Sequence, residues 1–189
     1  AAIANRFGLG VKLYIELPGA RTGLVPTREW RRAQGHASNI GDTIVAGIGQ
    51  GYLQLTPLSL ATMVARIASG HAVQPHLTRS IGASLQSGAR PEAWPSMGIP
   101  ERNLQVVRDG MWQVVNDPHG TAPLARLALP GVQMAGKTGS VQVRNVSREQ
   151  REHGYKSDNL PWEFRPHALF VCYAPFDAPR YAVALVVEH

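Results

Sequence analysis

Apolar residues repeat with a helical period in the stretch TPLSLATMVARIASG at 56–70. Thr56 followed by Pro57 is typical of a helix start, and Gly70 suits the left-handed position just past a helix end. The pattern therefore predicts a capped helix between these residues. The apolar positions on its predicted buried face are Leu60, Met63, Val64 and Ile67.

A second amphipathic helix is predicted from about Glu101 to Val115, and the sequence Asn-Asp-Pro at 116–118 ends it. A further short helix is predicted near 122–127. The apolar stripe of the long helix is expected to contain Leu104, Val107, Met111 and Val114.

The other segments before residue 131 carry weaker signals. Residues 1–10 resemble the last turns of a helix closed by Gly8 or Gly10. Residues 11–50 are rich in Gly, Pro and Thr, so we expect irregular structure with one short turn or helix start at 26–30. Residues 71–100 are expected to form extended segments and loops.

After residue 131 the apolar period changes to two, which is typical of β-strands. Strands are predicted within 132–143, 168–174 and 181–187. The short polar connection at 175–180 suits an antiparallel hairpin. The whole pattern predicts an α+β fold in which helices cover an antiparallel sheet.

Composition limits the classes of function. The chain has 189 residues, 44% of them hydrophobic, and a net charge of +6, which suits one domain with a sizeable core. The charge is not gathered into a run, so we expect a basic surface and no nucleic-acid partner. No carboxylate or cysteine stands at ligand spacing from His71 and His76, so neither a metal site nor a cofactor is expected. The single cysteine, Cys172, is expected to be a buried, inert thiol.

The stretch GVQMAGKTGSVQV at 131–143 fits two chemical patterns. Gly131, Gly136, Lys137 and Thr138 match the loop that cradles nucleotide phosphates, whereas Lys-Thr-Gly at 137–139 is also the motif that penicillin-recognising serine acyltransferases carry on a strand.

The surrounding residues favour the strand. A phosphate loop needs a helix that begins at the lysine, yet Gly139, Val141 and Val143 are poor helix starters and suit an extended strand. In a strand, Lys137 and Gly139 are expected on one face and Thr138 and Ser140 on the other. An ammonium group, two hydroxyls and strand amides suit an acyl substrate that carries a carboxylate.

Several stretches resemble the C-terminal part of the transpeptidase domain of the penicillin-binding protein 2 family, the class B enzymes of bacterial cell elongation. The quoted matches are FGLG, ELPGARTGLVPTREW, GDTIVAGIGQGYLQLTPLSLA, DGMWQVVNDPHGTA, MAGKTGSVQV, HALFVCYAP and YAVALVVEH. The resemblance implies a transpeptidase fold of the kind shared with serine β-lactamases. That fold would be incomplete in 1–189, which would form the C-terminal portion of one domain.

The same resemblance implies roles for four residues. Lys137 would organise charge around the nucleophile, and Thr138 and Ser140 would bind the carboxylate of a terminal D-alanine or of a β-lactam. The amide of Ser140 would supply half of an oxyanion hole, and Gly139 would complete the substrate-binding strip. Relatives usually carry threonine where Ser140 stands, so the hydroxyl is retained.

Two motifs of the family lack a match in the expected order. None of the ten serines has a lysine three residues later, so the S-x-x-K nucleophile and its base are missing from these residues. The one S-x-N match, Ser157-Asp158-Asn159, follows the Lys-Thr-Gly motif instead of preceding it and is interpreted as a coincidence. We therefore expect that the chain begins downstream of both motifs and does not acylate alone.

By resemblance, the parent protein is a serine D,D-transpeptidase that cross-links peptidoglycan stem peptides and is inhibited by β-lactams. It would act in cell-wall synthesis and cell shape at the periplasmic face of the inner membrane, beside a membrane glycan polymerase and elongation scaffold proteins. Two alternatives stay open: a non-catalytic peptide- or β-lactam-binding or interaction module, and, more remotely, a nucleotide-binding protein.

Overall fold

The computed structural model describes residues 1–37, 39–78, 94–141, 143 and 160–188. Its elements in chain order are α1 (Ala2–Arg6), α2 (Arg28–Ala33), α3 (Ile40–Gly47), α4 (Pro57–Ser69), α5 (Glu101–Asn116), η1 (Pro123–Ala125), β1 (Ala135–Val141), η3 (Trp162–Phe164), β2 (His167–Ala174) and β3 (Tyr181–Val187).

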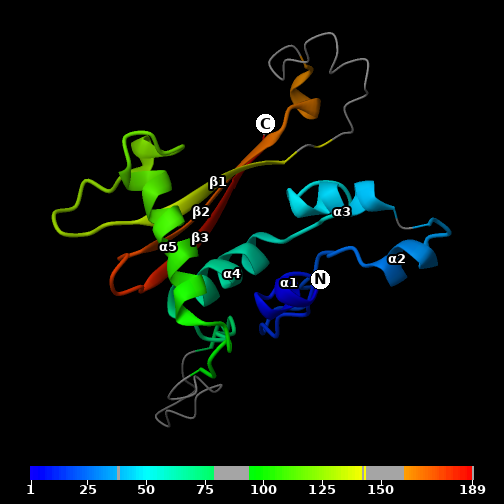
Figure 1. Cartoon of the computed structure of the whole chain (residues 1–189), viewed down its shortest axis with the longest axis horizontal. Coiled ribbons are helices and arrows are strands. Elements are labelled where there is room, and N and C mark those ends of the chain that lie inside the picture. The colour runs from blue at the N-terminus through cyan, green and yellow to red at the C-terminus, as the bar shows by residue number, and fades with distance from the viewer. Residues whose placement is uncertain (38, 79–93, 142, 144–159, 189) are drawn as a thin grey trace.

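The three strands form an antiparallel sheet in the order β1-β2-β3 (Figure 1). Helix α4 packs against β2 and β3, and α5 packs against β1 and α4. The core lies between the two helices and one face of the sheet, here called the helix-covered face. Its buried members are Val64, Ala68, Met111, Ala135, Val171 and Tyr173. The α+β architecture and all three strands agree with the sequence prediction.

The other face, here called the open face, carries the alternate side chains of the same strands. On β3 these are Tyr181, Val183, Leu185 and Val187, each about half exposed or more. Cys172 lies opposite Val183 on this face and is half-buried, so the expectation of a buried thiol holds only in part. Burial raises the pKa of its thiol above the usual value.

Helix α4 has the start and the end that its sequence predicts. The Thr56 hydroxyl accepts a hydrogen bond from the Ser59 amide, and the Ser59 hydroxyl accepts one from the Thr56 amide, both at 3.1 Å. This reciprocal capping box satisfies two amides that a helix start leaves without a partner. Gly70 ends the helix in the left-handed conformation, with φ of 72°.

Helix α5 has the predicted bounds but a different buried stripe. Leu104, Met111 and Val115 are buried, whereas Val107 is 46% exposed, so its predicted core position is wrong. The position one turn after Leu104 belongs to Arg108. Its Nε donates to the Ile67 carbonyl in the last turn of α4 at 2.8 Å, so a polar contact occupies part of this interface.

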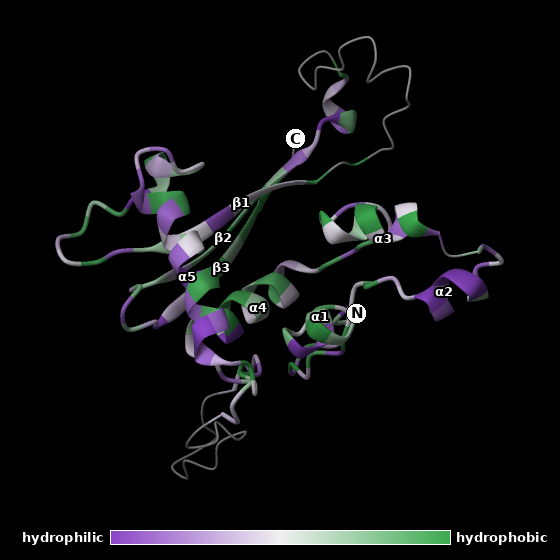
Figure 2. Cartoon of the chain, in the orientation of Figure 1, coloured by the Kyte–Doolittle hydropathy of each residue, from purple (hydrophilic) through white to green (hydrophobic). Residues whose placement is uncertain are grey.

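The irregular structure expected for 11–50 is wrong at 40–47, where α3 forms. Asn39 and Asp42 make a capping box, with the Asp42 amide donating to Asn39 Oδ1 at 2.8 Å. The Arg31 guanidinium joins α2 to this helix through Asp42 at 3.3 Å. In Figure 2, α2 is mainly hydrophilic, while α3 carries hydrophobic residues, many of them exposed.

Three other expectations can be compared with the structure. The short helix expected at 122–127 is a single 3-10 turn, η1, which contains only Pro123–Ala125. The ends of 71–100 are extended and meet in an antiparallel bridge between His71 and Ser96. Residues 79–93 lie outside the described part of the chain.

Arg66 ties the N-terminal helix to the core. Its side chain is buried, and the guanidinium donates to the Arg6 carbonyl at 2.7 Å and to the Val73 carbonyl at 3.0 Å. Burial lowers the pKa of this arginine because the charged form loses hydration. The two carbonyls offset part of that cost and fix α1 beside α4.

Tyr173 is the largest fully buried side chain of the core, and its hydroxyl has no hydrogen-bond partner among the described residues. Its ring stacks on Phe176, with 6.2 Å between ring centroids. Burial raises the pKa of Tyr173 to about 12, because the phenolate would lose its hydration.

We predict that Tyr173→Phe makes the free energy of unfolding less sensitive to high pH. A tyrosine in the unfolded chain ionises near pH 10, two units below the folded value, so the unfolded state binds fewer protons in this window. The free energy of unfolding of the wild type should fall by up to about 1 kcal/mol per pH unit there, relative to the variant. Chemical denaturation from about pH 9 to about pH 11 measures this difference.

Tyr181→Phe is the matched control, because this tyrosine is 68% exposed. Its stability curve should run parallel to that of the wild type. A Tyr173→Phe curve that also runs parallel would contradict the prediction.

Candidate active site

The motif residues 137–140 lie wholly inside β1. Lys137 is opposite Val171 of β2, and Ser140 is opposite Ala168. Strand pairing continues through Val141, and no helix begins at Lys137. The phosphate-loop interpretation is therefore wrong, since that loop requires a helix to start at its lysine.

The motif side chains alternate across the sheet as the sequence predicts. Lys137 and Gly139 share the helix-covered face with Ala135, and Thr138 and Ser140 lie on the open face. Ala135 is completely buried, whereas Lys137 is exposed. The helices thus cover the first part of β1 and leave its motif accessible.

β1 is an edge strand of the described sheet, because β2 is its only strand neighbour there. One row of its backbone amides and carbonyls has no strand partner within the described residues. An extended ligand can therefore align along this edge and use backbone hydrogen bonds. The Lys137 ammonium lies beside the strand and donates to the Thr138 carbonyl at 2.8 Å.

A second threonine meets the motif from outside the sheet. Thr121 follows α5, and its Oγ1 lies 3.2 Å from Thr138 Oγ1, within hydrogen-bond distance. Thr121 is exposed and Thr138 is half-buried. Reasoning from the sequence did not assign a role to Thr121, although it lies in the quoted stretch DGMWQVVNDPHGTA.

Side-chain hydrogen bonds hold the end of α5 against β1. The Asn116 amide nitrogen donates to the Met134 carbonyl just before the strand at 2.8 Å. The Trp112 indole donates to Gln133 Oε1 at 2.9 Å. Arg126 in turn donates to the Asn116 carbonyl at 2.6 Å. The loop that carries Thr121 is therefore fixed at its start and its end.

Gly120 allows this loop to approach the helix closely. A Cβ at this position would lie 2.4 Å from the Val114 carbonyl oxygen and 2.5 Å from that of Gln113. The Ala122 amide donates to the same Val114 carbonyl at 2.9 Å. Backbone contacts on both sides of Thr121 thus set its position.

Other candidate residues have weaker links to the motif. His119 is exposed and donates its backbone amide to Asp117, while His167 lies opposite Val141 at the end of the β1–β2 ladder. The S-x-N match at 157–159 and the arginine-rich residues 144–151 lie outside the described residues. In the part of the chain that the structure describes, no three His, Cys, Asp or Glu side chains gather as metal ligands would.

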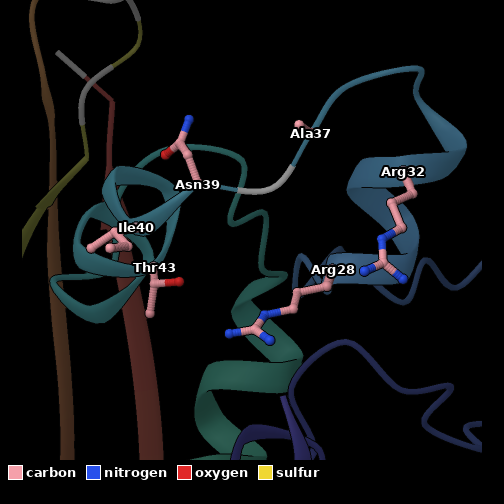
Figure 3. A pocket seen from close by; sticks show the side chains of 6 residues that line it. All are labelled: Arg28, Arg32, Ala37, Asn39, Ile40 and Thr43. Atoms are coloured by element: carbon pink, nitrogen blue, oxygen red, sulfur yellow. The ribbon is translucent and has the colours of Figure 1, made fainter.

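Three surface cavities lie away from the motif. The one in Figure 3 has a volume of about 300 Å³ and lies between α2 and α3, with the side chains of Arg28 and Arg32 extending towards α3. Larger hollows of about 790 Å³ and about 380 Å³ lie among α1, α2 and α3 and near the β2–β3 connection. None of these three is lined by residues 137–140, of which Lys137, Gly139 and Ser140 are exposed.

The sequence matches the family described as "Penicillin binding protein transpeptidase domain" over residues 1–189. The chain belongs to this penicillin-binding protein transpeptidase family. The resemblance inferred from the separate motifs is thereby confirmed along the whole chain, including the Lys-Thr-Gly strand.

Curated relatives extend far beyond the matched region. Peptidoglycan D,D-transpeptidase MrdA of Haemophilus influenzae is 34% identical over 187 residues, and that of Escherichia coli K12 is 31% identical over 189 residues. These matches cover 97% and 98% of this chain but only 28% and 29% of those proteins. The chain therefore spans less than a third of these relatives' length.

Solved structures of penicillin-binding protein 2 share the fold. The Pseudomonas aeruginosa protein in complex with WCK 5153 is 36% identical with a TM-score of 0.78, covering 99% of this chain and 38% of that one. The Helicobacter pylori protein in complex with MreC is 27% identical, also with a TM-score of 0.78, covering 98% and 31%. The predicted transpeptidase fold is confirmed.

We predict that Gly120→Ala destabilises the protein by about 1–3 kcal/mol, because the added methyl group overlaps two backbone carbonyl oxygens. Gly110→Ala within α5 is the control, since nothing lies within 4 Å of its Cβ position and alanine favours a helix. Thermal unfolding of both variants measures the difference. Equal melting temperatures for Gly120→Ala and wild type would contradict the close approach.

Proposed function

We propose that these residues form the C-terminal portion of the transpeptidase domain of a longer serine D,D-transpeptidase that cross-links peptidoglycan. One observation supports this above the others: residues 137–140 present an ammonium group and two hydroxyls along an accessible edge strand. The family membership and the D,D-transpeptidases among its relatives agree with it.

The proposed reaction is acyl transfer with a serine nucleophile. The hydroxyl oxygen attacks the carbonyl of the penultimate D-alanine and gives its proton to a lysine base. The lysine passes this proton to the leaving nitrogen as the peptide bond breaks, so terminal D-alanine leaves as the neutral amine and an ester joins the stem to the serine. An amine of a neighbouring stem then attacks the ester, forms the cross-link and regenerates the serine.

The residues of β1 bind and orient the donor in this proposal. Thr138 and Ser140 donate hydrogen bonds to the terminal carboxylate, and Lys137 places its positive charge beside the nucleophile. The amide of Ser140 supplies half of the oxyanion hole for the tetrahedral intermediate. Gly139 has no side chain, so the donor can approach the backbone closely along the strip.

The nucleophile belongs to another part of the proposed protein. Residues 1–189 contain no S-x-x-K sequence, so we place the serine and its lysine base upstream of these residues. In this proposal, residues 1–189 supply the substrate-binding strand, and the preceding portion of the domain supplies the serine nucleophile.

We place the protein at the periplasmic face of the bacterial inner membrane, where its proposed substrate lies. Among the described residues, no helix has both the length and the apolar character that a membrane crossing needs. Peptidoglycan stem peptides and β-lactams are the proposed ligands. A membrane glycan polymerase and scaffold proteins are the proposed partners, and the Helicobacter pylori relative solved with MreC supports the scaffold.

The second candidate is a non-catalytic module that binds peptides or β-lactams through the same strip. The lack of S-x-x-K within 1–189 is the observation in its favour. A complete gene that also lacked this motif upstream would support it over the enzyme.

We predict that a fluorescent penicillin does not label residues 1–189 covalently, because the chain contains no S-x-x-K nucleophile. A protein extended upstream to include that motif should become labelled. Denaturing gel fluorescence distinguishes the two results. Covalent labelling of the shorter chain would show that the nucleophile lies within it.

We predict that Lys137→Ala in the extended protein lowers the rate of penicillin acylation by about 10²-fold, because it removes a fixed charge next to the reacting groups. Lys12→Ala is the control, since Lys12 is also exposed but lies outside β1. Stopped-flow acylation rates provide the measurement. Similar rates for both variants would be incompatible with the proposed role of Lys137.

A further inference from the structure

We propose that Thr121 is a positioning residue that orients the hydroxyl of Thr138 for carboxylate binding. Thr121 donates its proton to Thr138 Oγ1, which leaves the proton of Thr138 free to point at the donor's carboxylate. The inference rests on the proposed function, because it assumes that a carboxylate binds at Thr138.

The direction of this hydrogen bond follows from the number of protons that each group can donate. The two Oγ1 atoms are 3.2 Å apart, and either can donate. Each hydroxyl has one proton, and an ionised carboxylate only accepts hydrogen bonds. If Thr138 donated to Thr121, it would have no proton left for the ligand. A bound carboxylate therefore requires that Thr121 donates and Thr138 accepts.

The structure fixes Thr121 before any ligand binds. The next amide, that of Ala122, donates to the Val114 carbonyl at 2.9 Å, and the preceding amide, that of Gly120, donates to the Asp117 carbonyl at 3.0 Å. The absence of a side chain at Gly120 permits this close packing. The backbone of Thr121 is thus held on both sides, which lowers the entropic cost of bringing its hydroxyl to Thr138.

Thr138 is held at two points as well. Its hydroxyl meets Thr121, and its carbonyl accepts a hydrogen bond from the Lys137 ammonium at 2.8 Å. In the proposed direction, the O–H groups of Thr121 and Thr138 form a chain that ends at the carboxylate. Successive hydrogen bonds in such a chain polarise and strengthen one another.

The test uses the protein extended upstream and two acyl donors that differ only in a terminal carboxylate or a primary amide. Thr121→Val removes the hydroxyl and keeps the shape of the side chain, whereas Thr121→Ser keeps the hydroxyl. We expect Thr121→Val to lower the second-order acylation rate of the carboxylate donor about three- to tenfold, the effect of one net hydrogen bond. The amide donor should react as with the wild type, and Thr121→Ser should stay within about twofold for both donors.

A Thr138→Val background separates positioning from a general structural effect. Adding Thr121→Val there should cause no further loss, because the acceptor is already gone. Thr121→Ala provides a second variant without a hydroxyl, and thermal unfolding checks that each protein is folded.

The outcomes separate the inference from the proposed function. The role of Thr121 alone would be overturned if the donors acylate the wild type and acylate Thr121→Val and Thr121→Ala at the same rates. Equal rate losses with both donors in these variants would also overturn it. A loss with Thr121→Ser as large as with Thr121→Val would do the same. If neither donor acylates the wild-type protein, the proposed function and this inference are overturned together.

Discussion

The register between β1 and β2 is the constraint on which the candidate site depends. Ala135 lies opposite Tyr173 and Lys137 opposite Val171, so the buried and accessible parts of β1 share one ladder. Because side chains alternate strictly along a strand, a slip of one residue would turn Lys137 to the open face and Thr138 towards the helices. Ala135 is completely buried where β1 packs against α5, and such a slip would replace it there with Met134 or Gly136.

Helix α5 transmits this packing to the loop beside the motif. Met111 and Val115 are buried in the core, and one residue later Asn116 reaches the backbone just before β1. The loop that carries Thr121 is therefore attached to the core through α5. This arrangement would carry the proposed binding strip on rigid elements, where small displacements of a hydroxyl are costly.

The sequence predicted the elements whose local signals agree with their packing. Thr56 and Gly70 mark the two ends of helix α4 in the sequence. The apolar residues after 131 repeat with a period of two, which is typical of strands covered on one face. Helix α3 escaped prediction because its glycines and Thr43 are poor helix formers and its apolar side chains are exposed, so no buried period marks it. Thr121 was missed as a site residue because its contact with Thr138 joins a loop to a strand, and such tertiary contacts leave no periodic trace.

The open face of the sheet has a practical consequence for anyone who purifies this polypeptide by itself. Four neighbouring apolar side chains of β3, at alternate positions from Tyr181 to Val187, are about half exposed or more. Contiguous surfaces of this kind promote self-association in water. β1, at the edge of the described sheet, adds backbone groups that have no strand partner among the described residues. Poor solubility of such a sample would thus reflect an uncovered sheet and would say nothing against the integrity of its core.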